Sequence, residues 1–342
     1  MRKVRILVCI PGSFLDDFFS PAARSELLSL GDVMVRTDLR APHDNEAYNA
    51  LIREFRPEIL VTGWGTPRLK AETVLEVPEL KYMCHVTGSI RANIEKAAMA
   101  VQRSDRPALL VSNWGPAGAR PVAEGAMMML LAGLRNAWPI QKAMHQEKGW
   151  PRHLAGKSLF GLKVGMHGLG IIAQEQVKLM QPWQPKISAY SPHVPDEVFT
   201  QLGVRRVTSL KALYAENEAV CIHASKTPEN FHIVNAEILR AMPDGALLVN
   251  TARGAIIDED ALIAELKTGR ISAALDVFEK EPLPPDSPLR GLDNCLLFPH
   301  VAGTTPSHSG GIADYALANL KRYLSGEPVK SVIPPERYDL MT

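Results

Sequence analysis

The stretch GLKVGMHGLGIIAQEQVKLM, residues 161–180, determines how the rest of the chain is interpreted. Residues 163–166 are an apolar run typical of a strand, residues 168–170 are a glycine turn, and the apolar spacing from Ile171 indicates a helix. Such a turn lets the backbone approach a pyrophosphate, and the N–H groups of the following helix stabilise the anion. Ala173 occupies the third small position of the G-x-G-x-x-G/A pattern. The stretch predicts a dinucleotide cradle, although the motif alone fits a plain glycine-containing turn equally well.

Length and composition favour a protein of two globular domains. The 342 residues are 46% hydrophobic, which is ample for two cores. A net charge of +1 gives no electrostatic basis for binding nucleic acid or an anionic membrane. The four cysteines, Cys9, Cys84, Cys221 and Cys295, are far apart and form no CxxC pair. We therefore expect a reduced, cytoplasmic protein with no metal site.

Two apolar segments are candidates for a targeting signal or a membrane span. The basic start MRKVRILVCIPG resembles a secretory signal, but its apolar run covers only residues 6–10 and no small-residue cleavage site follows. We interpret it as a first strand. The longest apolar segment, residues 125–134, is about half of a bilayer span. We therefore expect no membrane partner.

The first part of the chain alternates strands and helices. The expected strands are residues 4–10, 33–35, 59–62, 82–85 and 108–111, and the expected helices are residues 22–30, 46–55, 70–75 and 94–101. Repeated βα units predict a parallel sheet with helices on both faces.

The alternation breaks at residues 113–118, NWGPAG. Pro121 then stands where a first-turn proline would open the apolar helix 122–134. We expect a hinge and a domain boundary at this break. The resulting division is a discontinuous substrate domain, residues 1–115 plus 302–342, and a dinucleotide-binding domain, residues 116–301.

A second series of βα units follows the break. Its six expected strands are residues 164–167, 186–190, 219–223, 246–250, 273–277 and 295–298. Within it, Asp258 can cap a helix over residues 258–266 and Gly269 can end that helix. The last helix, residues 313–324, is expected to return to the first domain. Six strands fit one doubly wound nucleotide domain, so the fold class is α/β with two domains.

Three ionisable residues follow the ends of expected strands, where α/β proteins place their chemistry. Arg253 can bind a carboxylate, His300 can give or take a proton near neutral pH, and Glu281 can favour the charged imidazolium. A 2-keto or 2-hydroxy acid needs this combination. Each residue taken singly fits better as a surface or loop charge, and only their joint placement beside a dinucleotide turn favours an active site.

The chain resembles the D-isomer-specific 2-hydroxyacid dehydrogenase family over nearly its whole length. The matching stretches are HVTGSIR (85–91), PVAEGAMMMLLAGLR (121–135), GLKVGMHGLGIIA (161–173), MPDGALLVNTARGAIIDEDAL (242–262), AALDVFEKEPLP (273–284) and FPHVAGTTP (298–306). The resemblance implies a flavodoxin-like substrate domain, a Rossmann-type nucleotide domain and transfer of a hydride between a nicotinamide dinucleotide and a small 2-keto or 2-hydroxy acid. It also implies a homodimer formed through the nucleotide domains, in which Trp150 would contact the partner.

Residue roles are carried over from this resemblance. Arg253 would bind the substrate carboxylate and carbonyl, His300 would be the general acid, and Glu281 would orient and charge the histidine. The turn at Gly88 and Ser89 would supply a second carboxylate contact, or be a simple βα turn. The implied cofactor-binding residues are Gly168, Leu169, Gly170, Ile171, Ile172, Ser191, Thr227, Thr251, Ala252 and Asp276. For Asp276, contact with the nicotinamide carboxamide competes with a structural role at a strand end.

Two departures from the family pattern leave the cofactor preference open. Where NAD enzymes carry an acidic residue for the ribose hydroxyls, residues 190–193 read Tyr-Ser-Pro-His, and no arginine in that loop replaces the acid. NAD is therefore expected, with NADP as a second candidate. Residues 224–227, ASKT, stand where the family has apolar or proline positions.

The remaining alternatives concern the substrate pocket and the function itself. Trp64, Arg91, Trp114 and Arg120 lie at expected strand ends or at the hinge, and fit substrate selection and ordinary packing or solvation equally well. The alternative function is a dinucleotide-sensing binding protein or corepressor on the same fold.

Overall fold

The computed structural model describes residues 3–101, 108–303, 305 and 309–341. It divides into two compact units, Met1–Gly118 with Thr304–Thr342, and Ala119–Gly303. Thr304 and Pro306, from the FPHVAGTTP stretch, lie outside the described residues. Each unit carries one sheet.

The first unit contains a five-stranded parallel sheet in the order β2-β1-β3-β4-β5. Its strands are β1 (Arg5–Cys9), β2 (Asp32–Arg36), β3 (Ile59–Thr62), β4 (Tyr82–His85) and β5 (Leu110–Ser112). This is the strand order of flavodoxin-like folds, so the predicted architecture of this unit is confirmed.

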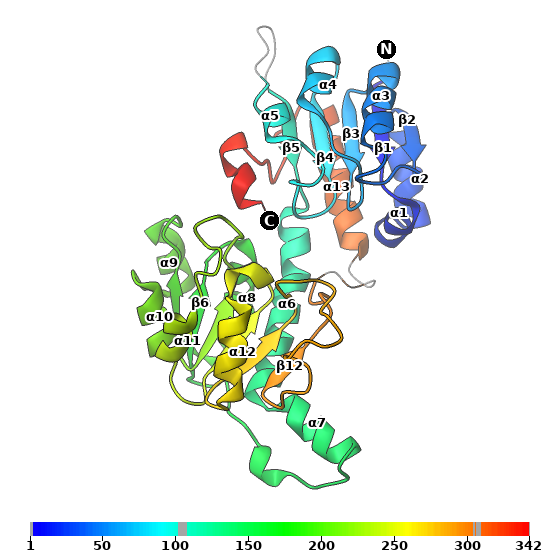
Figure 1. Ribbon diagram of the computed structural model, residues 1–342. Helices are drawn as coiled ribbons and strands as arrows, with labels where there is room; N and C mark the ends of the chain where they lie inside the picture. Colours follow the sequence, from blue (N-terminus) through cyan, green and yellow to red (C-terminus); the bar gives the residue numbers. More distant parts are fainter. Residues whose placement is uncertain (1–2, 102–107, 304, 306–308, 342) are drawn as a thin grey trace. The chain divides into compact units, whose positions relative to one another are not determined.

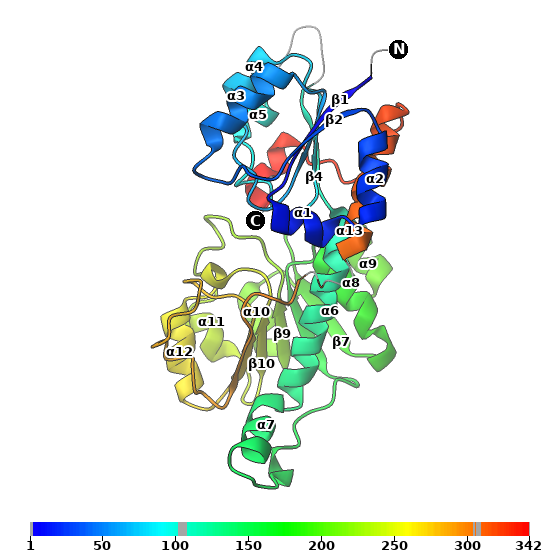
Figure 2. The same cartoon turned by 90° about the vertical axis from the view of Figure 1, so that its right-hand side faces the viewer.

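Helices cover both faces of this sheet (Figures 1 and 2). They are α1 (Gly12–Phe18), α2 (Pro21–Ser29), α3 (Asn45–Phe55), α4 (Ala71–Glu76), α5 (Lys96–Met99), α13 (Ser309–Leu324) and the 3-10 helix η4 (Pro335–Leu340). Leu7 and Cys9 pack with α3, α4 and α5, whereas Ile6 and Val8 pack with α1, α2 and α13. Alternate residues of β1 therefore enter two separate cores, as expected for a strand buried on both faces.

Two helix predictions in this unit differ from the structure, and one helix was missed. The helix α1 was not predicted, and the expected helix 94–101 is only the single turn α5. Ile94 forms an isolated parallel bridge with Leu69, outside the sheet, so the helix does not begin there. The last helix begins at Ser309, four residues before the expected start.

The second unit contains a seven-stranded parallel sheet in the order β12-β11-β10-β9-β6-β7-β8. Its strands are β6 (Lys163–His167), β7 (Lys186–Tyr190), β8 (Arg205–Arg206), β9 (Ala219–Ile222), β10 (Leu247–Asn250), β11 (Ser272–Leu275) and β12 (Cys295–Leu297). Numbered within the unit, the order is 3-2-1-4-5-6-7, which is the Rossmann arrangement extended by one strand. The predicted doubly wound fold is confirmed. The prediction of six strands was wrong, because β8 is a two-residue edge strand without an apolar run and could not be recognised.

Two layers of helices enclose this sheet (Figure 2). The helices are α6 (Gly115–Leu134), α7 (Ala137–His145), α8 (Ile171–Met180), α9 (Asp196–Leu202), α10 (Leu210–Glu216), α11 (Ala236–Ala241) and α12 (Glu259–Lys267), with 3-10 turns η1 (Arg152–Leu154), η2 (Gln181–Trp183) and η3 (Gly254–Ile256). The helices α10, α11 and α12 share one core, and α6, α8 and α9 share the other. As predicted, the Asp258 side chain caps α12 by accepting from Ala261 N, and Gly269 follows its end at a φ of +74°.

The prediction that Pro121 opens the long apolar helix is wrong. The helix α6 begins at Gly115, and Pro121 lies inside it. Asn113 Oδ1 accepts from Gly115 N at 3.1 Å, which gives this helix an earlier start. Pro121 has no N–H to donate to the carbonyl of Ala117, so one helical hydrogen bond is lost there. The boundary between the two units falls in this part of α6, after Gly118.

Three properties of the described residues bear on the function. None of their helices has the length and apolar character needed to cross a bilayer. The four cysteines are buried and unbonded to one another. Within the described ranges, no group of three or more His, Cys, Asp or Glu side chains could hold a metal ion.

Candidate active site

The glycine turn after β6 can only be made by glycine at its first position. Gly168 has a φ of +94°, and a Cβ on it would lie 2.8 Å from Ala224 N and 2.9 Å from the carbonyl carbon of His223. Gly168 N also donates to Tyr190 O at 2.9 Å. The turn is therefore held against the loop after β9 and against the end of β7.

The next residues of the turn leave space at the start of α8. Leu169 is fully buried, so its side chain does not occupy the space in front of α8. Gly170 is the N-cap of α8, contributes no capping side chain, and apart from its chain neighbours no described heavy atom lies within 4 Å of where its Cβ would stand. The first N–H groups of α8, beginning at Ile171 and Ile172, have no partner within the helix. This open helix end suits a phosphate group.

A buried hydroxyl lies after strand β10, which is separated from β6 by β9. Thr251 Oγ1 is buried and has no hydrogen-bond partner in the part of the chain that the structure describes. The side chain of Asn250 shapes this loop by accepting from Ala252 N and donating to Arg253 O, both at 3.0 Å. A buried hydroxyl without a partner is destabilising unless a bound group pairs with it. The open cradle at α8 and this hydroxyl fit a dinucleotide.

Two further predicted cofactor residues, Thr227 and Ser191, lie in loops with their own internal bonds. Thr227 Oγ1 accepts from Asn230 N at 3.3 Å, within a turn after β9. Ser191 is half-buried after β7, and its carbonyl accepts from Arg206 Nη1 at 3.3 Å. Sequence analysis missed Arg206, because it belongs to the next strand rather than to the loop. The only sequence signal is the arginine pair that forms β8.

Arg253 lies in a loop that packs backbone to backbone against the loop before Glu281. A Cβ on Gly254 would stand 1.9 Å from the carbonyl carbon of Phe278, so only glycine permits this approach. Arg253 Nη1 donates to Ala252 O at 2.6 Å. Burial lowers the pKa of Arg253, and the charge of Glu281 partly offsets that effect. A guanidinium stays charged in proteins, so Arg253 can bind a carboxylate.

The structure brings Glu281 and His300 into direct contact. His300 Nδ1 lies 2.7 Å from Glu281 Oε2, and Glu281 Oε1 accepts from Phe278 N at 3.0 Å. The carboxylate therefore has one oxygen on the backbone and one on the imidazole. His300 is 50% exposed and has a φ of +58°, a left-handed conformation that non-glycine residues seldom adopt. With Nδ1 on Glu281, Nε2 remains as the nitrogen that can meet a substrate.

Asp276 fixes the segment that follows His300. Its buried carboxylate accepts from Val301 N at 2.8 Å and from Ala302 N at 3.0 Å. The long helix α6 approaches the same segment, since a Cβ on Gly125 would stand 2.2 Å from Ala302 O. These contacts fit the structural role at the strand end that is the alternative to contact with a nicotinamide.

The turn at Gly88 and Ser89 lies in the first unit, separate from the residues above. A Cβ on Gly88 would stand 2.9 Å from Trp114 Cζ2, and Gly88 O accepts from Asn113 Nδ2 at 2.8 Å. Ser89 Oγ donates to Met341 O at 2.9 Å, so its hydroxyl is already engaged. Only the backbone of this turn remains for a ligand. The structure assembles the predicted site residues in two sets, one in each unit.

The four pocket candidates have different surroundings. Trp64, which is 40% exposed, packs edge-on against Trp114 with the ring centroids 5.7 Å apart. Phe14 and Phe18 complete this aromatic cluster. Arg91 is exposed and accepts through its carbonyl from Arg68. Arg120 pairs with Glu175 of α8 at 3.4 Å.

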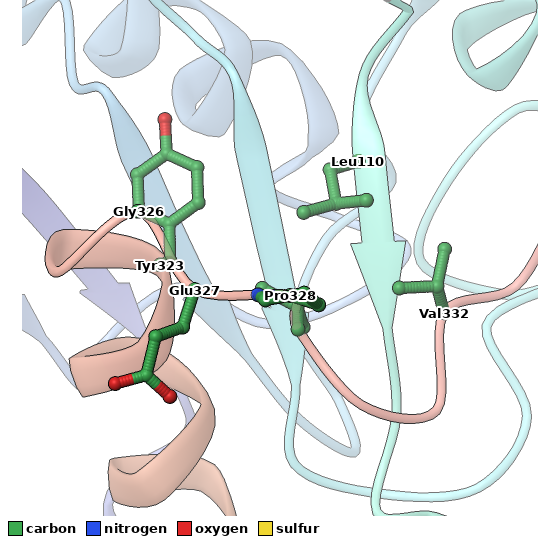
Figure 3. A pocket seen from close by; sticks show the side chains of 7 residues that line it. Leu110, Tyr323, Gly326, Glu327, Pro328 and Val332 are labelled. Atoms are coloured by element: carbon green, nitrogen blue, oxygen red, sulfur yellow. The ribbon is translucent and has the colours of Figure 1, made fainter.

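A surface hollow of about 490 Å³ lies elsewhere on the first unit (Figure 3). Leu110, Tyr323, Pro328 and Val332 line it together with neighbouring residues. None of the predicted site residues lines it. Its volume alone gives no reason to place the chemistry there.

Comparison with known proteins agrees with the observed fold. Residues 127–302 match the sequence model described as the D-isomer specific 2-hydroxyacid dehydrogenase, NAD binding domain. A glyoxylate reductase of Thermofilum pendens is 32% identical over 89% of this chain and 89% of its own length. A D-3-phosphoglycerate dehydrogenase of Methanocaldococcus jannaschii is 34% identical over 81% of this chain, which spans only 51% of that relative.

Among solved structures, a glyoxylate reductase from Paecilomyes thermophila superimposes with a TM-score of 0.80 at 22% identity, covering 97% of this chain and 99% of the other. At that identity the likeness supports the fold alone. The family match itself covers more than half of the chain. On these grounds the chain belongs to the D-isomer specific 2-hydroxyacid dehydrogenase family.

Proposed function

We propose that the protein is an oxidoreductase that interconverts a small 2-keto acid and its D-2-hydroxy acid with NAD(H). The observation that carries this proposal is the pair formed by His300 and Glu281 at 2.7 Å, beside the charged Arg253 and in the same unit as the phosphate cradle. An acid, its carboxylate partner and a guanidinium are the groups that reduction of a keto acid requires.

In this mechanism each residue has one task. A nicotinamide dinucleotide held at the turn of Gly168 and Gly170 would supply the hydride. His300 donates a proton from Nε2 to the carbonyl oxygen, and its Nδ1 keeps the bond to Glu281. Arg253 binds the substrate carboxylate and stabilises the charge that develops on the carbonyl oxygen. In the oxidation direction, neutral His300 accepts the hydroxyl proton.

The cofactor site in this proposal is the second unit and the substrate domain is the first. The backbone of Gly168, Gly170 and Ile171 would hold the pyrophosphate, and Thr251 would meet the nicotinamide half. The backbone of Gly88 and Ser89 would provide the second carboxylate contact. Support comes from the open helix end at Gly170 and from the unpaired hydroxyl of Thr251.

The test is turnover of the purified protein. Oxidation of NADH and of NADPH is followed with glyoxylate, hydroxypyruvate, pyruvate and bulkier 2-keto acids. We expect reduction of at least one of these acids and a loss of two to four orders of magnitude in His300→Ala, the usual effect of removing a general acid. Binding of dinucleotide without turnover of any acid would instead support a sensing protein. The relatives named above are a reductase and a dehydrogenase, which does not favour that alternative.

We also propose that the protein is a cytoplasmic homodimer formed through its nucleotide-binding units. The segment after α7 carries Trp150, which is 72% exposed, and Phe160, which is also exposed. Large apolar side chains that remain exposed on one segment are typical of a protein interface. Sedimentation of the parent and of Trp150→Ala tests this: a parent that sediments as a monomer at micromolar concentration contradicts the dimer.

A further inference from the structure

We infer that Arg206 makes the loop after β7 a site for the 2′-phosphate of NADPH, so that the protein binds NADPH at least as tightly as NADH. This inference rests on the proposed function, because it assigns the adenosine ribose of the same cofactor. It concerns the arginine that the loop sequence itself does not contain.

The loop after β7 follows the second strand of the nucleotide-binding unit. In a doubly wound nucleotide domain, the residue after the second strand meets the ribose hydroxyls of the adenosine. That strand here is β7, and Tyr190 O accepts from Gly168 N at 2.9 Å. Ser191 therefore follows directly after the residue that is bonded to the phosphate cradle.

The loop after β7, residues 191–195, contains no acidic residue. An acidic side chain at this place would bind the ribose hydroxyls of NADH and repel a 2′-phosphate. Ser191 and His193 stand there instead, one half-buried and the other exposed. A hydroxyl and an imidazole can both donate to a phosphate, and neither repels it.

Arg206 lies beside this loop and contacts its backbone. It is the register partner of Ala189 in β7, so the sheet delivers its side chain beside the loop. Nη1 donates to Ser191 O at 3.3 Å, Nη2 donates to Val194 O, and the guanidinium lies 4.0 Å from the centroid of the Phe199 ring. A cation held in this way loses little further conformational freedom when an anion binds.

The guanidinium of Arg206 has more N–H groups than its contacts in the loop use. A guanidinium has five N–H groups. In the described part of the chain two of them go to loop carbonyls, and Nε lies 2.5 Å from Asp196 Oδ1. Asp196 is 82% exposed, so this ion pair contributes little and its carboxylate can turn into solvent when a phosphate arrives. Nε of Arg206 is buried, whereas the side chain as a whole is 29% exposed.

A purely structural role for Arg206 is the competing explanation, since its bonds to two carbonyls also close the loop. The two explanations differ in what they predict for ligands with and without the 2′-phosphate. Arg206→Gln keeps an N–H donor for the loop and removes the charge. Arg205→Gln is the matched control, because Arg205 belongs to the same strand but pairs with Glu216 at 2.5 Å.

The experiment is titration calorimetry with NADH, NADPH, 5′-AMP and 2′,5′-ADP. We expect the parent to bind 2′,5′-ADP more tightly than 5′-AMP by roughly tenfold, the scale of a charged hydrogen bond. Arg206→Gln should remove that difference and leave NADH binding within about twofold of the parent, while Arg205→Gln should change neither. Ser191→Asp should weaken NADPH and 2′,5′-ADP and shift the preference toward NADH.

Two results would overturn the inference. One is equal loss of NADH and NADPH affinity in Arg206→Gln, which would make Arg206 a loop-closing residue only. The other is a parent that binds NADH but rejects NADPH. Both leave the proposed function intact. A folded parent that binds neither dinucleotide would instead remove the proposed function, and the inference with it.

Discussion

Glu281 holds His300 with one carboxylate oxygen while its other oxygen is bonded to the backbone N–H of Phe278. The imidazole is thereby fixed in orientation, and the negative charge lies against the ring nitrogen that the substrate does not use. The left-handed backbone of His300 is maintained by its neighbours, since Val301 N and Ala302 N are both bonded to buried Asp276. Two carboxylates therefore hold the proposed acid: Glu281 contacts the ring of His300, and Asp276 binds the backbone that follows it.

Glu281→Gln separates the charge of this pair from its geometry. The amide oxygen can still accept from Phe278 N, but it no longer favours the imidazolium of His300. We expect the alkaline limb of the reduction rate to move to lower pH, with a smaller loss at acid pH, because a carboxylate stabilises an adjacent imidazolium better than an amide does. The measurement is kcat/KM against pH.

Arg253→Gln is the comparison for that profile. It should raise KM and lower kcat without moving the alkaline limb, because it removes substrate binding rather than proton donation. An alkaline limb that stays at the parent position in Glu281→Gln would show that Glu281 does not charge His300 during turnover.

Gly254→Ala should disturb the loops of Arg253 and Glu281 together. The added Cβ would stand 1.9 Å from one backbone atom of Phe278 and 2.1 Å from another, and backbone cannot rotate away as a side chain can. We expect a destabilisation of about 1–3 kcal/mol, the range for overpacking, together with a loss of turnover. Urea unfolding and kcat measure the two effects.

Gly149→Ala is the control, since its nearest Cβ neighbour would be 3.7 Å away. It should behave as the parent. A Gly254→Ala protein with parental stability and turnover would mean that the two loops can separate without harm.

Much of the fold could be predicted because most of its strands are short, largely apolar runs that alternate with helices. Strands β3, β4 and β7 have the predicted bounds, since each has a clear apolar core. Short edge elements carry no such pattern, which is why β8 was missed. The start of α6 was misplaced because Pro121 gives a strong local signal, whereas the bond from Gly115 N to Asn113 depends on the folded loop.

The candidate site shows the same division. Arg253, Glu281 and His300 could be selected from sequence because each follows a strand. The bond between Glu281 and His300 was expected, but the second oxygen of Glu281 on Phe278 N could not be foreseen. Arg206 was missed because its contact with Ser191 joins residues 15 positions apart through an edge strand.

Gly170→Val tests the phosphate cradle with little risk to the fold. The backbone of Gly170 has a φ of −71°, which any residue can adopt, and its Cβ would enter open space. We expect a folded protein that binds NADH at least about a hundredfold more weakly, because the side chain fills the place of the phosphate. Calorimetry measures binding and thermal unfolding checks the fold. Unchanged NADH affinity in a folded variant would disprove the cradle, and Gly149→Val is the matched control.

The last prediction concerns acid stability and a histidine in each unit. Burial lowers the pKa of His85 in the first unit to about 4, and burial with a smaller effect of His223 lowers the pKa of His167 in the second to about 3. In the unfolded chain both titrate near 6.5. Below that pH the unfolded state binds protons that the folded state does not, so stability falls as pH falls from about 6.5 toward 4.

Each histidine should contribute a slope of about 1.4 kcal/mol per pH unit within that window. His167→Phe removes one titrating group, although it also leaves the hydroxyl of Tyr214 without its partner at 3.1 Å. The readout is therefore the dependence of the urea midpoint on pH rather than its value at one pH. We expect the His167→Phe midpoint to fall less steeply than that of the parent between pH 6 and 4, and parallel curves would show that His167 takes up a proton in the folded protein.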